Sequence, residues 1–285
     1  MKDLNRGATY RVATIDASLE AIPEHKVFNT YPGETFVYEP QRFIPKDIVM
    51  FNIRQGYITE HDLKVLCTIA NFGSLCVTSR GLKRLLYMAG DDLGDNDHRM
   101  QNSIKRLARN GLIALGRFKH ANTEQLSSLR IILLTELGSR IARNMGVNHK
   151  FNSVEVLTSD VIKSRAQTFM LLSNYLINLV NDIDRFESRP VLTNKALSDE
   201  AIVRPALKLT FTSGEDIYFE VPRRTMHNDA NLEHLVDKLR RYSLVFTDRQ
   251  PPVVIINGED EEDCRVIYDY IVKNSDIHNF PNENL

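Results

Sequence analysis

The fold is decided by a change of hydrophobic period within residues 97–119, which read DHRMQNSIKRLARNGLIALGRFK. Met100, Ile104 and Leu107 recur at helical spacing, so they predict a helix over residues 97–110 with one buried stripe. Asn110 and Gly111 then stop the helix, because both residue types tolerate left-handed backbone. The apolar run that follows favours a strand over residues 112–119.

Two helices are predicted before this stretch. Thr59 is placed to cap a helix over residues 60–72, and Asp62 at its third position can complete a capping box. Thr78 is placed to cap a second helix over residues 79–89. The inner face of the first helix is expected to comprise Leu63, Leu66, Cys67 and Ala70, and that of the second Leu82, Leu85 and Leu86. Asn96 is expected to cap the helix of residues 97–110.

After the polar residues 120–127, a second strand is predicted over residues 129–134 and a fourth helix over residues 136–145. Three short helices followed by a β-hairpin is the element order of a winged helix, a variant of the helix-turn-helix.

The rest of the chain predicts a different organisation. Residues 154–186 are strongly apolar at helical spacing, which favours a core or dimerisation helix. Beyond them we expect strands over residues 206–212, 216–221 and 253–257 and helices over residues 230–246 and 261–274. The fold class is therefore α+β, a winged helix followed by a small α/β domain. The expected divisions are an extended or partly disordered leader (1–56), the winged helix (57–150), a connecting apolar helix (151–190) and the α/β domain (191–285).

Composition indicates a globular protein, with 42% hydrophobic and 26% charged residues. No apolar run approaches the ~18–20 residues that span a bilayer, and the N-terminus lacks the apolar core of a secretory signal. We therefore expect a cytoplasmic protein with no membrane contact. The three cysteines, Cys67, Cys76 and Cys264, contain no CxxC pair, so no disulfide framework or zinc finger is expected. The sequence contains no Walker A loop and no GxGxxG motif, and no metal site or cofactor is expected.

The charge is distributed unevenly along the chain. Residues 76–145 contain twelve Lys and Arg against six Asp and Glu, a net charge of +6, whereas residues 255–285 contain two against eight, a net charge of −6. A basic segment of this kind is typical of a half that binds a polyanion.

The helix of residues 97–110 is the candidate for reading DNA, because its apolar stripe leaves polar and basic residues outside. Arg99, Gln101 and Asn102 suit base edges, and Lys105, Arg106 and Arg109 suit phosphates. The flanking candidates are Arg80, Lys83 and Arg84 on the second helix and Arg117, Lys119 and His120 at the wing. The alternative is an ordinary solvated helix face.

Residues 59–145, with SIKRLARNGLIALGRFK (103–119) and ILLTELGSRIA (132–142), resemble the winged helix of the replication-relaxation family of bacterial plasmids and integrative elements. A weaker similarity continues through residues 216–242. The resemblance implies binding of double-stranded DNA, with a relaxase, replication or transfer proteins as partners. It also implies a second domain with a restriction-endonuclease-like fold.

Nucleases of that fold hold Mg²⁺ with an acidic residue on one strand and an acid-x-lysine on the next. Glu220 fits the second position, but Pro222 stands where the lysine is expected, and Ala206 occupies the place of the first acid. Lys238 could replace the missing lysine, whereas Asp199 and Glu215 are off register for the first acid. Because of these departures, we expect the second domain to be a scaffold without nuclease activity. In that case Glu220 is expected to pair with a neighbour such as Arg223 and not with a metal ion.

Three functions follow. The first is a non-enzymatic DNA-binding protein of a mobile element that recruits partners, with a homodimer left open. The second is a transcription regulator with the same winged helix, whose C-terminal domain senses a ligand or oligomerises. The third is a metal-dependent nuclease.

Overall fold

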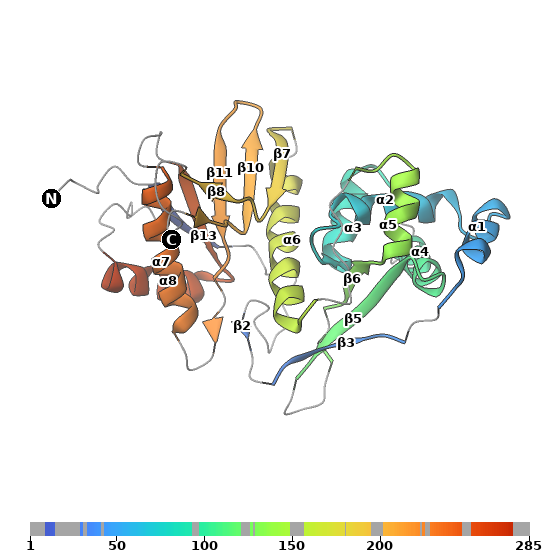
Figure 1. Cartoon of the computed structure of the whole chain (residues 1–285), viewed down its shortest axis with the longest axis horizontal. Coiled ribbons are helices and arrows are strands. Elements are labelled where there is room, and N and C mark those ends of the chain that lie inside the picture. Colours follow the sequence, from blue (N-terminus) through green and yellow to red (C-terminus); the bar gives the residue numbers. More distant parts are fainter. Residues whose placement is uncertain are drawn as a thin grey trace. The chain divides into compact units, whose positions relative to one another are not determined.

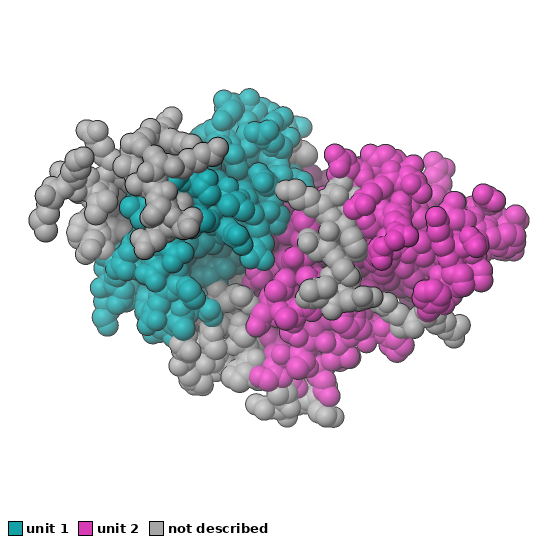
Figure 2. All heavy atoms as spheres, in the orientation of Figure 1, with its two compact units in different colours: residues 1–32, 174–285 teal, residues 33–173 magenta. Residues whose placement is uncertain are grey.

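The computed structural model describes residues 9–14, 29–30, 33–40, 43–92, 97–120, 126–127, 129–148, 157–179, 181–194, 202–222, 224–225, 229–246 and 252–275. They form eight helices and several small sheets (Figure 1), a mixed α+β fold as expected. The chain divides into two compact units, residues 33–173 (unit 2) and residues 1–32 with 174–285 (unit 1), which are coloured separately in Figure 2. Helix α6 (Ser159–Leu179) begins in unit 2 and ends in unit 1.

Unit 2 contains the predicted order of three helices, a β-hairpin and a further helix. The helices are α2 (Glu60–Asn71), α3 (Ser79–Met88), α4 (His98–Arg109) and α5 (Glu136–Asn144), and the hairpin consists of β5 (Ile113–Lys119) and β6 (Ile131–Leu134). With β3 (Thr35–Tyr38) and β4 (Val77–Thr78), the hairpin forms an antiparallel sheet in the order β3-β5-β6-β4.

The helix starts follow local hydrogen bonding. Thr59 and Asp62 form the predicted capping box of α2, and the Thr78 hydroxyl accepts from the Gly81 N–H at the start of α3. Asn96 lies outside the described residues, and the residue before α4 is Asp97, with a left-handed φ of 60° and no side-chain cap. The buried face of α2 is also rotated from the expected one, because Val65 and Ile69 are buried whereas Leu63 and Cys67 are only half-buried.

The described part of residues 1–56 is not a leader. β3 pairs antiparallel with β5, and β1 (Thr9–Thr14) pairs parallel with β13 (Val253–Gly258) about 240 residues away, so each supplies an edge strand. Helix α1 (Lys46–Arg54) follows β3 and places Val49 in the core.

A glycine makes room for the added strand β3. Gly116 of β5 lies opposite Tyr38 of β3, and a Cβ atom added to Gly116 would stand 2.4 Å from the ring of Phe36. A glycine inside a strand commonly marks such a close approach. The sheet of unit 2 is therefore built to accept β3.

Unit 1 is a mixed sheet in the order β1-β13-β11-β10-β7. β7 (Ile183–Ser188), β10 (Leu207–Phe211) and β11 (Asp216–Glu220) form an antiparallel meander, after which α7 (Ala230–Val245) leads to β13, parallel to β11. Helix α8 (Glu261–Asn274) follows β13. Two short pairs complete the unit, namely β2 (Asn29–Thr30) with β12 (Arg224–Thr225) and β8 (Leu192–Thr193) with β9 (Ile202–Val203).

The apolar helix predicted over residues 154–186 was too long. α6 ends at Leu179, and residues 183–188 are the edge strand β7, whose backbone pairs with β10. The boundary between the two units falls inside α6, between Ser173 and Asn174, and not at residue 150 or 190. In the described part of the chain, no helix has both the length and the apolar character needed to cross a membrane.

Because β1 is part of the unit 1 sheet, its fully buried side chain Tyr10 should be needed for stability. Tyr10 is 1% exposed, and its hydroxyl donates to the Leu239 carbonyl at 2.8 Å. We expect Tyr10→Ala to lower the free energy of unfolding by about 3–5 kcal/mol through the cavity it leaves. Urea denaturation measures this change. Arg11→Ala, at the exposed neighbour on the same strand, is the control, and an equally small effect of both variants would show that β1 is not part of the folded unit.

Candidate nucleic-acid interface

Helix α4 lies on unit 2 through the predicted stripe. Met100, Ile104 and Leu107 are buried, and Ser103 is buried with them. The same spacing turns the other face of α4 outward, and this helix contains no acidic residue. The arrangement presents a basic and polar face on a fixed apolar base.

A buried ion pair fixes the rotation of α4 against α2. The Arg106 guanidinium donates to both carboxylate oxygens of Asp62, from Nε at 2.7 Å and from the second nitrogen at 2.8 Å, and the Asp62 side chain is fully buried. Bidentate pairs of this kind are geometrically specific. Arg106, predicted to bind phosphate, is therefore a scaffold residue, and the sequence missed this because its partner Asp62 already had a local role as a cap.

The pKa of Asp62 reflects this environment. Burial, the largest single influence, acts to raise it, but the hydrogen bonds from Arg106, Ser103 and Thr59 together outweigh burial and hold the pKa below its usual value. Asp62 is therefore a carboxylate at neutral pH and keeps Arg106 in place.

His61 extends the same α2–α4 contact. Its Nδ1 lies 2.8 Å from the Ser103 hydroxyl and its Nε2 lies 3.0 Å from a carboxylate oxygen of Asp91, which follows α3. These three residue types also form hydrolase triads. Ser103, however, is fully buried, so no substrate can reach its hydroxyl, and the group serves to position α4.

The predicted reading residues on α4 are mostly accessible. Arg99, Asn102, Lys105 and Arg109 are exposed, and Gln101 is half-buried. Arg99 donates to the Asp92 carbonyl at 3.1 Å. Lys105 and Arg109 make no ion pair with a carboxylate in the part of the chain that the structure describes.

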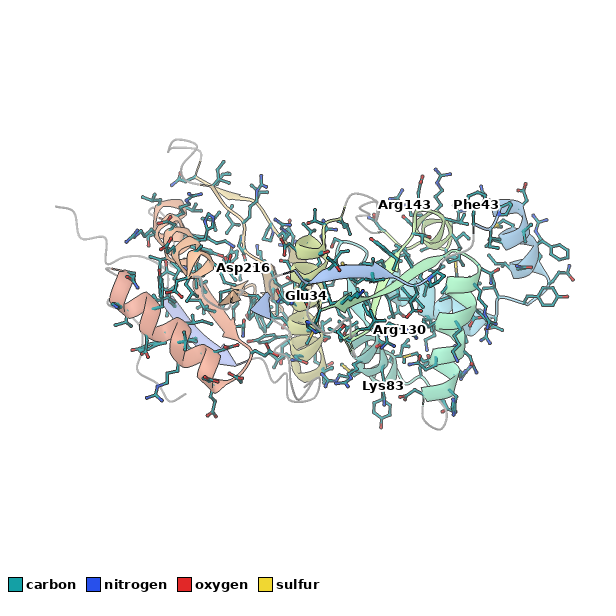
Figure 3. All side chains as sticks on the ribbon, turned by 90° about the horizontal axis from the view of Figure 1, so that it is seen from below. Glu34, Phe43, Lys83, Arg130, Arg143 and Asp216 are labelled. Atoms are coloured by element: carbon teal, nitrogen blue, oxygen red, sulfur yellow. The ribbon has the colours of Figure 1, made fainter. Side chains whose placement is uncertain are left out.

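Of the candidates that flank α4, some are exposed and others form ion pairs or hydrogen bonds within unit 2. On α3, Arg80 is exposed, Arg84 is half-buried, and Lys83, labelled in Figure 3, pairs with Asp97 at 2.7 Å. On β5, Arg117 lies 3.9 Å from Glu39 and donates to the Ser127 carbonyl at 3.4 Å, while Lys119 is half-buried opposite Thr35. His120 is buried. Arg117 is thus held by the sheet and by Glu39, so the exposed side chains among the predicted candidates lie on α4 and α3.

The second candidate site, around Glu220, is a buried cluster at the end of β11. Lys238 of α7 donates to one carboxylate oxygen at 2.6 Å and the Tyr242 hydroxyl donates to the other at 2.7 Å. The predicted link between Glu220 and Lys238 is present, whereas Arg223 lies outside the described residues. Burial raises the pKa of Glu220, against the opposing effect of Lys238, and the pKa of Tyr242 is raised well above its usual value by burial and by Glu220.

The other carboxylates considered for this site do not join it. Asp199 lies outside the described residues, and Glu215 is exposed in the turn before β11. Asp216, which follows Glu215 and was not a candidate, is bound by Lys208 at 2.6 Å and by the Thr210 hydroxyl. Among the described residues, no three His, Cys, Asp or Glu side chains are grouped to hold a metal ion.

In comparisons with known protein families, curated proteins and solved structures, nothing matches this chain.

Removing the partner of Arg106 should loosen α4. We expect Asp62→Ala to lower the free energy of unfolding of unit 2 by about 2–3 kcal/mol, because it leaves a partly buried guanidinium without its anion. Chemical denaturation measures this change, and Glu60→Ala on the exposed face of the same helix is the control. Equal stability of both variants would contradict the scaffold role of the pair.

The sign of the pH dependence follows from the lowered pKa of Asp62. A carboxyl group with a lowered pKa in the folded state stabilises the protein above the unfolded-state pKa, ~3.9, and this stabilisation is lost as the pH falls through the folded-state pKa. Asp62→Asn should therefore flatten the loss of stability below about pH 4.

Proposed function

We propose that this chain is a double-stranded DNA-binding protein of a mobile genetic element and that α4 is its recognition helix. The observation that carries the proposal is the outer face of α4, where exposed Arg99, Asn102, Lys105 and Arg109 lie over a buried stripe on a helix without acids. Arg and Asn suit base edges, and unpaired cations suit phosphates.

The arrangement of unit 2 supports a winged helix. Helices α2, α3 and α4 precede the β5–β6 hairpin, and β4, between α2 and α3, pairs with β6. In a winged helix the third helix enters the major groove and the hairpin lies beside it. The residues of unit 2 then divide into readers, Arg99 and Asn102, phosphate contacts, Lys105 and Arg109, and the scaffold residue Arg106.

The topology of unit 1 is compatible with the restriction-endonuclease-like fold that the family resemblance implies. An antiparallel meander, a helix and a parallel strand follow one another, and Glu220 stands at the end of the third strand. Both oxygens of the Glu220 carboxylate accept hydrogen bonds, from Lys238 and Tyr242, whereas nucleases of that fold hold Mg²⁺ with two acids on neighbouring strands. We propose that this unit is not a nuclease and recruits partners such as a relaxase, replication or transfer proteins in the cytoplasm.

A transcription regulator with the same DNA-binding unit is the second candidate. A cavity beside α4, lined in part by Lys105 and Arg109, favours it, because a ligand bound there would reach residues proposed to bind DNA.

Alanine substitutions on α4 test the proposed function. We expect Arg99→Ala or Asn102→Ala to weaken binding to the preferred site by about 1–3 kcal/mol, since each removes a base contact. Lys105→Ala and Arg109→Ala should instead weaken binding to all duplexes and reduce the salt slope by about 1 each. Mobility-shift titrations at several salt concentrations measure both effects, with Lys273→Ala on α8 as the control. Unchanged affinity for all four variants would exclude α4 as the reading element.

The proposed lack of nuclease activity has its own test. Supercoiled and linear DNA are incubated with the purified protein and Mg²⁺ or Mn²⁺. The cleavage should be no greater than in the same incubation with the Glu220→Ala variant. Nicking that the Glu220→Ala substitution abolishes would overturn the assignment of unit 1.

A further inference from the structure

A cavity of about 600 Å³ lies within unit 2, beside the C-terminal half of α4. Its walls come from Glu39, Pro40 and Ile44, which lie between β3 and α1, from α4, from Leu115 of β5 and from Arg130, which precedes β6. Ligand sites commonly measure about 300–1,000 Å³, so the cavity has the size of a small-molecule site.

The cavity carries an excess of positive charge. Lys105, Arg109 and Arg130 line it together with one acid, Glu39. Arg130 is already bound to Glu39 by two hydrogen bonds of 2.8 and 3.1 Å. Lys105 and Arg109 are four residues apart and share one side of α4. The described residues therefore leave two cations in the cavity with no carboxylate bound to them.

The remaining walls are apolar. Pro40 and Ile44 lie on the segment before α1, Ala108 lies on α4 between the two cations, and Leu115 lies on β5. Apolar walls with a few convergent polar groups are the usual composition of a small-molecule site. The ligand that fits this lining has an anionic group for Lys105 and Arg109 and a ring body for the apolar walls.

We propose that this cavity binds a nucleoside phosphate and that the bound nucleotide and DNA exclude each other. The phosphate contacts Lys105 and Arg109, and the base packs between Pro40, Ile44 and Ala108. The mutual exclusion rests on the proposed function, because it requires that Lys105 and Arg109 also bind DNA phosphates. The binding of the nucleotide itself does not depend on the proposed function. A ligand that takes residues needed by DNA lowers the affinity for DNA, and DNA lowers the affinity for the ligand equally.

The experiment uses the full chain and two substitutions at Ala108, which lies in the cavity wall and makes no proposed DNA contact. Ala108→Phe fills the cavity, and Ala108→Ser keeps it open. Isothermal titration with AMP, ATP and inorganic phosphate should show saturable binding of a nucleotide to the original chain and to Ala108→Ser. The affinity of the nucleotide for Ala108→Phe should be lower by about tenfold or more. Thermal unfolding establishes that both variants are folded, and Arg109→Gln replaces Ala108→Phe should the latter not fold.

The outcomes separate the two proposals. Loss of nucleotide binding in Ala108→Phe supports the cavity site even if the chain binds no duplex, in which case only the DNA function fails. A nucleotide that displaces duplex from Ala108→Ser but not from Ala108→Phe supports the exclusion. The cavity site is overturned if neither nucleotide binds, if Ala108→Phe binds as tightly as Ala108→Ser, or if inorganic phosphate binds as tightly as the nucleotides.

Discussion

The buried carboxylate of Asp62 is the constraint on which the arrangement of unit 2 depends. It accepts the Thr59 N–H at 2.8 Å, which starts α2, and two hydrogen bonds from Arg106, which orient α4. A buried charge needs a partner, so Arg106 cannot leave for a phosphate without a large cost in free energy. The strongest cationic contact of α4 is therefore internal. Exposed Lys105 and Arg109, by contrast, pair with no carboxylate in the described part of the chain.

A second buried pair ties the N-terminal part of the chain to this unit. Lys163 of α6 donates to Glu34, just before β3, at 2.5 Å, and both side chains are almost completely buried. β3 in turn lies along β5 where Gly116 leaves room for Phe36. Glu39 and Pro40, which directly follow β3, line the cavity beside α4, so the strand added to the sheet also positions part of the cavity wall.

Local patterns were predictable, and long-range pairings were not. The capping box of Thr59 and Asp62 and the stripe of Met100, Ile104 and Leu107 depend on neighbours within a few residues, so the sequence indicated both. β1 was missed because its partner β13 is some 240 residues away and its own side chains are mixed. β7 was taken for helix because the apolar period of α6 gave no sign of its end. Arg106 was assigned to DNA because residue type alone cannot show which arginine finds a buried acid.

Lysine footprinting shows whether the outer face of α4 contacts DNA. The protein is acetylated with and without a duplex that it binds, and the modification of each lysine is measured by mass spectrometry. We expect DNA to protect Lys105, while the reactivity of Lys273 on α8, which is exposed and outside unit 2, stays the same. Equal reactivity of Lys105 with and without bound duplex would contradict this expectation.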